Sequence, residues 1–191
     1  MNISILLPYK ENYSPTYPGA VSLFVDATSK LSTYKKDITV FGNTEFKKKL
    51  YGSYINIKLP KNNFLKSQST SYVNKFVDLQ GEINSDIIEV HNRPNYVSKL
   101  NQLKKKIVLY FHNDPLSMLG SKKIKERIFL LNNCERIIFN SQWSKNRFLN
   151  NLENIYHKSD RLEVIHQSIN KTSVDLKKKQ KLITFVGKLN L

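Results

Sequence analysis

The sequence contains a single cysteine, Cys134, in 191 residues. One thiol cannot form a disulfide within the chain or supply a cysteine metal cluster, and this usage fits a reducing compartment. No apolar run approaches the roughly 18 residues that a membrane-spanning helix needs, and the first residues lack the basic leader of a signal peptide. These absences predict a cytoplasmic protein.

Three motifs that carry common enzyme chemistry are also missing. The chain has no Gly-x-Ser-x-Gly turn, no P-loop and no Gly-x-Gly-x-x-Gly. Cys134 opens the apolar run Cys134–Phe139, where a thiol is expected to be buried and unreactive. The sequence therefore argues against a serine or cysteine nucleophile and against a standard dinucleotide-binding turn.

The four histidines do not form a metal-binding pattern. They share no local ligand spacing, and no cysteine joins them. The histidines are His91, His112, His157 and His166. We therefore predict no metal and no other cofactor.

Acidic residues are few: 31 lysines and arginines stand against 15 aspartates and glutamates, which gives a formal net charge of +16. Lysine is abundant throughout, together with asparagine and isoleucine, so we attribute most of this charge to biased composition and solvated helix faces. A positive field also attracts anionic lipid or nucleic acid. The inner face of the cytoplasmic membrane is the second interpretation. Nucleic acid comes last, because no RRM signature or helix-turn-helix pattern is present. The lysine runs lie at 47–49, 104–106, 122–125 and 177–181.

Short apolar runs alternate with helical stretches, which indicates βαβ units and a doubly wound parallel α/β sheet. Several runs are continuously apolar, as strands covered on both faces must be. The expected strands are Ile3–Leu7, Asp37–Phe41, Tyr54–Leu59, Ile87–His91, Ile107–Phe111, Arg136–Phe139, Leu162–Ile165 and Leu182–Val186. The expected helices are Ala20–Leu31, Ser71–Ile83, Tyr96–Leu103, Lys122–Asn132 and Trp143–Asn150. One face of the first helix is expected to carry Val21, Phe24, Val25, Thr28 and Leu31.

A polar stretch without an apolar face, Asn170–Lys181, marks the expected domain boundary. We predict one domain over residues 1–170, a linker over 171–181 and the first strand of a second, truncated domain over 182–191. A lone strand is not a domain, so we expect the chain to be a fragment, a truncated gene product or a chain that has lost its second half.

Ligands of open parallel sheets bind beyond the carboxyl ends of the strands. Two strands end there in similar segments, His91-Asn92-Arg93-Pro94 and His112-Asn113-Asp114-Pro115. Near neutral pH, histidine can donate or accept a hydrogen bond or carry a positive charge. It can therefore orient a sugar hydroxyl or stabilise a leaving phosphate. We favour a functional role for His112, whereas His91 could equally be a surface or capping residue.

Other polar positions are expected at the same edge. Pro18 and Gly19 precede the first helix, where a glycine lets the backbone approach a ligand and helix amides favour phosphate. Ser141 is a natural helix N-cap. Trp143 is more often a core anchor than a sugar platform, so we expect it to pack inside.

Taken together, these segments resemble the retaining GT-B glycosyltransferases of glycosyltransferase family 4, especially bacterial members that build lipopolysaccharide and other surface polysaccharides. The resemblance covers nearly the whole chain. It rests on five segments in order, namely Ile5–Pro8 with Pro18–Ala20, Asp86–Pro94, Tyr110–Met118, Ile138–Leu149 and Phe185–Asn190.

The resemblance implies a Rossmann-like acceptor domain in an enzyme that transfers a hexose from a nucleotide-sugar donor to the hydroxyl of a glycan or lipid-linked acceptor, without an obligatory metal. Gly19 would then face donor phosphates and acceptor, and His112 would lie beside the transferred sugar. His91, Asn92, Arg93, Asn113, Asp114 and Ser141 would line the acceptor site. Gly187 and Lys188 would contact the donor diphosphate, with lysine in the place of the usual arginine and without its bidentate fork.

Two departures from the family pattern follow. The segment Val164–Asn170 lacks the usual asparagine-glycine pair, and the family's second phosphate lysine and paired glutamates would lie beyond Leu191. We therefore expect the 191 residues alone to be inactive. The alternatives are a noncatalytic glycosyltransferase-like subunit and a basic nucleic-acid-binding α/β protein, although nucleic acid is not the partner we expect.

Overall fold

The computed structural model describes residues 1–59, 67–152 and 160–167. Seven parallel strands form one sheet in the order β3-β2-β1-β4-β5-β6-β7. The strands are β1 (Ile3–Leu6), β2 (Ile38–Gly42), β3 (Ser53–Asn56), β4 (Ile87–His91), β5 (Lys106–Phe111), β6 (Arg136–Phe139) and β7 (Leu162–Val164). The predicted parallel α/β sheet is confirmed. The predicted linker, the strand Leu182–Val186 and the segment 182–191 lie outside the described residues.

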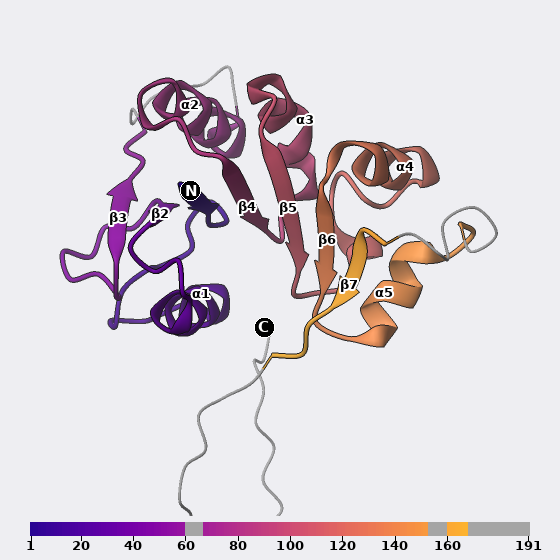
Figure 1. The fold of residues 1–191 in the computed structure, drawn as a ribbon, viewed down its shortest axis with the longest axis horizontal. Coiled ribbons are helices and arrows are strands. Elements are labelled where there is room, and N and C mark those ends of the chain that lie inside the picture. Colours follow the sequence, from indigo (N-terminus) through magenta and orange to yellow (C-terminus); the bar gives the residue numbers. More distant parts are fainter. Residues whose placement is uncertain (60–66, 153–159, 168–191) are drawn as a thin grey trace, which may run out of the picture.

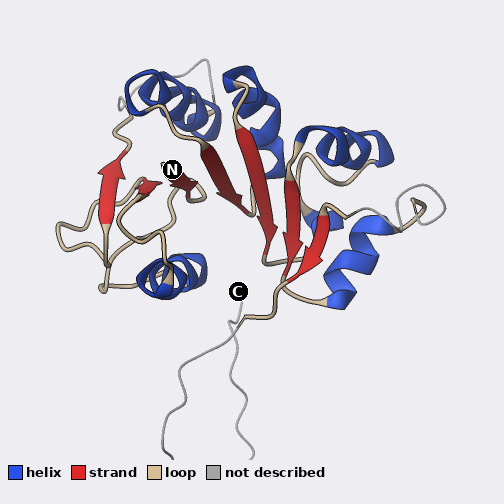
Figure 2. Ribbon diagram, viewed as in Figure 1, coloured by secondary structure: helices blue, strands red, loops and turns tan. Residues whose placement is uncertain are grey.

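Helices connect the strands as predicted, with one difference (Figure 2). The helices are α1 (Ala20–Leu31), α2 (Gln68–Ile83), α3 (Val97–Leu100), α4 (Ile124–Asn133) and α5 (Gln142–Leu149). The predicted helix Tyr96–Leu103 is instead a short α3 between two 3-10 turns, η1 (Pro94–Tyr96) and η2 (Asn101–Leu103); a third turn, η3 (Pro115–Ser117), follows β5. Proline lacks an amide hydrogen and therefore starts rather than continues a helix, as Pro94 and Pro115 do.

The sheet separates two apolar layers. α1 packs on β1 and β2 through a cluster that includes Ile5, Leu7, Val21 and Val25. α2, α3, α4 and α5 cover the opposite face and share the larger cluster, to which β1 contributes Leu6 (Figure 1). Successive strand residues point to opposite faces, so both faces of β1 are apolar.

The buried stripe of α1 differs from the predicted one. Leu31 is 82% exposed, whereas Asp26 is buried. The carboxylate of Asp26 accepts a hydrogen bond of 2.8 Å from the Tyr51 amide, so this polar residue faces inward. The prediction was wrong for Leu31 and for Thr28, which is also exposed. The buried side of α1 runs through Ser22, Asp26 and Ser29 beside Val21 and Val25, so it includes polar residues that an apolar pattern does not report.

Candidate functional site

The carboxyl ends of β4 and β5 bring the two predicted histidines together. Strand order reverses between β1 and β4, because the chain first runs outward to β2 and β3 and then returns. Ligands of open α/β sheets bind at such a reversal. His91 ends β4 and is paired in register with Tyr110, and His112 directly follows β5. Residues two apart share a face, so Glu89, His91, Tyr110 and His112 lie on one side of the sheet.

A chain of hydrogen bonds links four side chains at this place. Glu89 Oε1 lies 2.7 Å from His91 Nε2, and His91 Nδ1 lies 2.8 Å from His112 Nε2. His112 Nδ1 contacts the side-chain amide nitrogen of Gln167. His91 is fully buried, so it is not a surface histidine.

The carboxylate of Glu89 fixes the protons along this chain when both rings are neutral. A carboxylate only accepts, so His91 Nε2 carries its proton and His91 Nδ1 is left as an acceptor. His112 must then donate from Nε2, and its Nδ1 presents a lone pair toward Gln167. The exposed Gln167 is the one member of the chain that a ligand hydroxyl could replace without disturbing the core.

Burial, and to a smaller extent the neighbouring His91, lowers the pKa of His112 to about 3. The ring is therefore neutral at physiological pH. A neutral imidazole serves as a hydrogen-bond acceptor or donor, and it does not supply the positive charge that would stabilise a phosphate.

The backbone of His112 is held from both sides. Its amide donates to Asn92 Oδ1 over 2.8 Å, and its carbonyl accepts from Asn140 Nδ2 over 2.7 Å. Asn92 adopts a left-handed conformation with φ of 50°, and its own amide bonds the Tyr110 carbonyl at 2.9 Å. Three adjacent strand ends thus position one residue.

Aromatic rings fix the orientation of the His112 ring. The Tyr110 ring stacks on it with centroids 4.4 Å apart, and Phe24 of α1 meets it edge-on at 5.0 Å. The Tyr110 hydroxyl donates to the Ile165 carbonyl over 2.8 Å. Such locked neighbours give a preorganised site rather than a mobile one.

The start of α1 differs from a simple phosphate-binding turn. Gly19 caps the helix with extended backbone, and the Glu11 carboxylate accepts a 3.0 Å hydrogen bond from the Ser22 amide. A Cβ on Gly19 would lie 1.8 Å from Glu11 Oε1. The glycine therefore gives room to Glu11, whose negative charge already occupies the position that favours an anion.

The remaining predicted site residues lie at the same edge with separate partners. Arg93 donates to the Asn92 carbonyl over 2.8 Å, and Asp114 caps η3 and pairs with Arg147 at 3.1 Å. Ser141 caps α5 by accepting from the Ser144 amide at 3.2 Å. Pro18 and Asn113 are exposed.

Trp143 is not a core residue, so the packing prediction was wrong. It is 59% exposed, and the guanidinium of Arg147 lies over its ring at 5.6 Å. Trp143 is the second residue of α5, whose buried side is occupied by Ser144, Phe148 and Leu149. The helical period places Trp143 on the outer side.

Two predicted donor residues, Gly187 and Lys188, lie outside the described residues. Across residues 1–59, 67–152 and 160–167, no group of three potential metal-ligating side chains comes together.

Sequence reasoning missed Glu89, Glu11 and Gln167. Glu89 could have been found, because a lone acid in the run Ile87–His91 shares a strand face with His91. Glu11 and Gln167 reach the site through tertiary contacts that no local pattern reports.

Solved structures with a similar fold are known, whereas no family model and no curated protein matches the sequence. The chain is similar to Anabaena Alr3699/HepE in complex with UDP, with 15% identity and a TM-score of 0.55 over 89% of this chain and 45% of that one. It is also similar to UDP-GlcNAc 2-epimerase from Neisseria meningitidis bound to UDP-GlcNAc, with 14% identity and a TM-score of 0.53 over 86% and 46% of the two chains.

A glycosyltransferase from Rickettsia africae gives 12% identity and a TM-score of 0.56 over 88% and 44% of the chains. The chain thus spans less than half the length of each of these proteins. At such identities the similarity shows the fold alone, and it confirms the predicted Rossmann-like α/β architecture of a GT-B half.

Proposed function

We propose that this chain is the acceptor-side half of a glycosyltransferase. The reaction is transfer of a hexose from a nucleotide-sugar donor to an acceptor hydroxyl with retention of configuration, in the synthesis of lipopolysaccharide or another surface glycan. The fold shared with a glycosyltransferase and with proteins solved with UDP or UDP-sugars supports this proposal. The cytoplasm is the proposed location.

The observation that carries the proposal is the neutral His112, held in place at the end of β5, next to the reversal of strand order between β1 and β4. Its Nδ1 lone pair can accept a hydrogen bond from a sugar hydroxyl once Gln167 moves aside. The low pKa of His112 keeps this lone pair available across the physiological range. Of the two roles expected for His112, orienting a hydroxyl therefore fits better than stabilising a leaving phosphate.

Glu89 and His91 act as positioning residues in this proposal. The Glu89 carboxylate orders the tautomer of His91, and His91 in turn requires the proton of His112 on Nε2. Donor phosphates are assigned to the other half of the enzyme, where Gly187 and Lys188 begin the proposed donor domain.

The test is release of nucleoside diphosphate from a panel of nucleotide-hexoses in the presence of glycan acceptors. It is run on the 191-residue chain and on the complete product of its reading frame. We expect turnover by the complete product only. His112→Ala should lower kcat/KM by about tenfold or more, which corresponds to loss of one hydrogen bond.

His166→Ala is the matched control, because His166 is an exposed histidine near the same edge. Its activity should equal that of the wild type. Absence of turnover with every donor would rule out the proposed reaction. Equal effects of the two substitutions would rule out the proposed role of His112.

A further inference from the structure

A polar cavity lies at the carboxyl edge of the sheet, between the start of α2, η1 and η3. Its volume is about 340 Å³. The polar residues that line it are Ser69 from the first turn of α2, Asn92, Arg93 and Asn95 after β4, and Ser117 from η3. None of the described residues around this space is acidic.

Arg93 is the charged residue of this cavity. It is half-buried, and its guanidinium donates to the Asn92 carbonyl over 2.8 Å. A guanidinium carries five N–H donors, so one hydrogen bond leaves most of them for another acceptor. Within residues 1–59, 67–152 and 160–167, Arg93 forms no ion pair. A half-buried cation without a carboxylate partner is suited to bind an anion.

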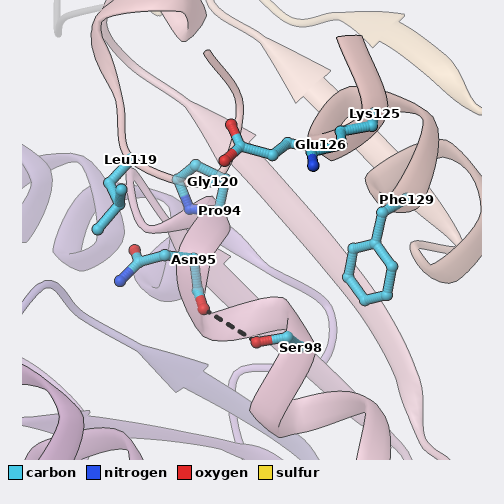
Figure 3. A pocket seen from close by; sticks show the side chains of 8 residues that line it. All are labelled: Pro94, Asn95, Ser98, Leu119, Gly120, Lys125, Glu126 and Phe129. Atoms are coloured by element: carbon cyan, nitrogen blue, oxygen red, sulfur yellow. Dashed lines mark hydrogen bonds between the residues drawn. The ribbon is translucent and has the colours of Figure 1, made fainter. Parts of the chain in front are cut away.

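The acids on neighbouring elements have other partners. Asp114, which caps η3, pairs with Arg147 at 3.1 Å. Glu126 lines a larger cavity of about 410 Å³ next to the polar one, and its carboxylate accepts from the Lys123 amide at 2.9 Å (Figure 3). Neither carboxylate therefore neutralises Arg93.

Asn95 contributes an amide to the polar cavity. Asn95 and Leu119 line both cavities, and in Figure 3 the Asn95 side-chain amide points away from Lys125 and Phe129, which line only the larger one. The Asn95 backbone carbonyl accepts from Ser98 Oγ at 3.4 Å, whereas the side chain forms no hydrogen bond with any residue that the structure describes. This amide can therefore donate to an oxyanion beside Arg93.

Asn92 connects the cavity with the candidate site. It lines the cavity, and its Oδ1 accepts the His112 amide hydrogen over 2.8 Å. The His112 ring contacts Phe24 of α1, whereas the cavity is lined by α2, and these two helices cover opposite faces of the sheet. A ligand that reaches both places must therefore carry its charged group and its reacting hydroxyl on different parts of the molecule.

We propose that Arg93 and Asn95 bind an anionic group of the acceptor, a carboxylate or a phosphate, so that the acceptor is an acidic rather than a neutral sugar. The identity of the ligand as an acceptor rests on the proposed transferase function. The planar guanidinium offers paired donors that match two oxygens of either anion, and the Asn95 amide adds another donor.

The test measures binding to the 191-residue chain without donor, at about 0.15 M salt, where exposed charges more than about 8 Å apart are largely screened. The probes are glucuronate, glucose 6-phosphate, inorganic phosphate and glucose, each titrated while NMR follows the amide resonances. We expect both charged sugars to bind at least about tenfold more tightly than glucose or inorganic phosphate, and to shift the resonances of Arg93 and Asn95.

Arg93→Gln should weaken binding of the charged sugars by about tenfold or more, because the charge-assisted hydrogen bonds are lost. Arg93→Lys should restore only part of the affinity, since lysine keeps the charge but lacks the paired donors. Arg136→Gln is the matched control. It makes the same charge change at the start of β6, where Arg136 pairs with Glu163 at 3.0 Å, and it should change the affinity by less than about threefold.

Asn95→Asp tests the cavity without altering an arginine. The new carboxylate has nearly the same shape as the amide, and its charge should repel the anion and lower the affinity by about tenfold or more. Asn113→Asp makes the same change at an exposed asparagine of the same edge, and its effect should stay below about threefold. Thermal melting checks that each variant is folded.

Equal losses in Arg93→Gln and Arg136→Gln, or equal affinities for glucose and the charged sugars, would overturn the inference. Inorganic phosphate that binds as tightly as glucose 6-phosphate would also overturn it, because the site would then take free phosphate rather than an acidic sugar. Turnover by the complete product with neutral acceptors, without binding of charged sugars, would refute this inference alone. Binding of charged sugars without any turnover would refute the proposed reaction instead.

Discussion

Asn92 and Asn113 each follow a histidine at the end of a strand, but their surroundings differ. Asn92 is 6% exposed and accepts a hydrogen bond from the His112 amide, whereas Asn113 is exposed. Replacing Asn92 by alanine leaves a backbone donor without its acceptor and places a less suited residue at positive φ, each at a cost of roughly 1–2 kcal/mol. We expect Asn92→Ala to lower the free energy of unfolding by about 2–3 kcal/mol in urea titrations.

Asn113→Ala is the control for this comparison, and its effect should stay within about 0.5 kcal/mol of zero. If both variants unfold at the same urea concentration, the hydrogen bond from the His112 amide does not stabilise the fold.

His112 also makes stability depend on pH. Its folded pKa is depressed to about 3, below the ordinary value of 6.5, so the unfolded chain binds more protons between these two values. Stability is therefore fully present above pH 6.5 and falls as the pH drops toward 3, by at most about 1.4 kcal/mol per pH unit from this group. Urea titrations at several pH values should show a shallower fall for His112→Gln than for the wild type.

His166→Gln removes an exposed histidine and should reproduce the wild-type dependence. Parallel curves for all three proteins would mean that His112 is freely protonated in the folded state. The pH profile thus separates a buried, neutral His112 from a solvated one.

Two glycines show how the same substitution acts differently in a helix and in a turn. Gly81 lies inside α2 with nothing within 4 Å of an added Cβ, whereas Gly120 has φ of 92° and is packed on Asn95. Gly81→Ala should raise the free energy of unfolding by about 0.5–1 kcal/mol, because alanine restricts the unfolded chain and favours helix. Gly120→Ala should lower it by about 2 kcal/mol or more through strain and overlap.

Differential scanning calorimetry of both variants measures these opposite effects. A stabilised Gly120→Ala would mean that the loop before α4 is not docked on η1.

The elements themselves could be predicted well, because their signals are local. β4, β6 and α1 have the predicted bounds, since apolar runs and caps define them. The predicted Tyr96–Leu103 helix is replaced by a short α-helix between two 3-10 turns. The first turn starts at Pro94 and the left-handed Lys104 ends the second, so few residues remain for an α-helix between them. The exposure of Leu31 and Trp143 depends on which side of a helix meets the sheet, and tertiary contacts decide that.

The candidate site could be predicted only in part. His91 and His112 could be placed in the site because both follow predicted strands, and the carboxyl ends of parallel strands lie at one edge of the sheet. Their direct hydrogen bond follows from the register of β4 against β5, and Gln167 arrives from beyond β7, so neither could be derived from spacing along the chain.

The order of the strands in the whole molecule also delays the pairing of the first strand during synthesis on the ribosome. β1 is made first, but one of its two neighbours in the sheet is β4. The Asn2 amide can therefore donate its hydrogen bond to the Asp86 carboxylate only after 84 further residues have been made. At about 5–20 residues per second on the ribosome, the first strand waits several seconds with one edge open. A nascent chain halted before Ile87 would therefore expose an unpaired edge of an apolar strand, and we expect it to need a chaperone more than a chain halted after Val164, in which all seven strands have been made.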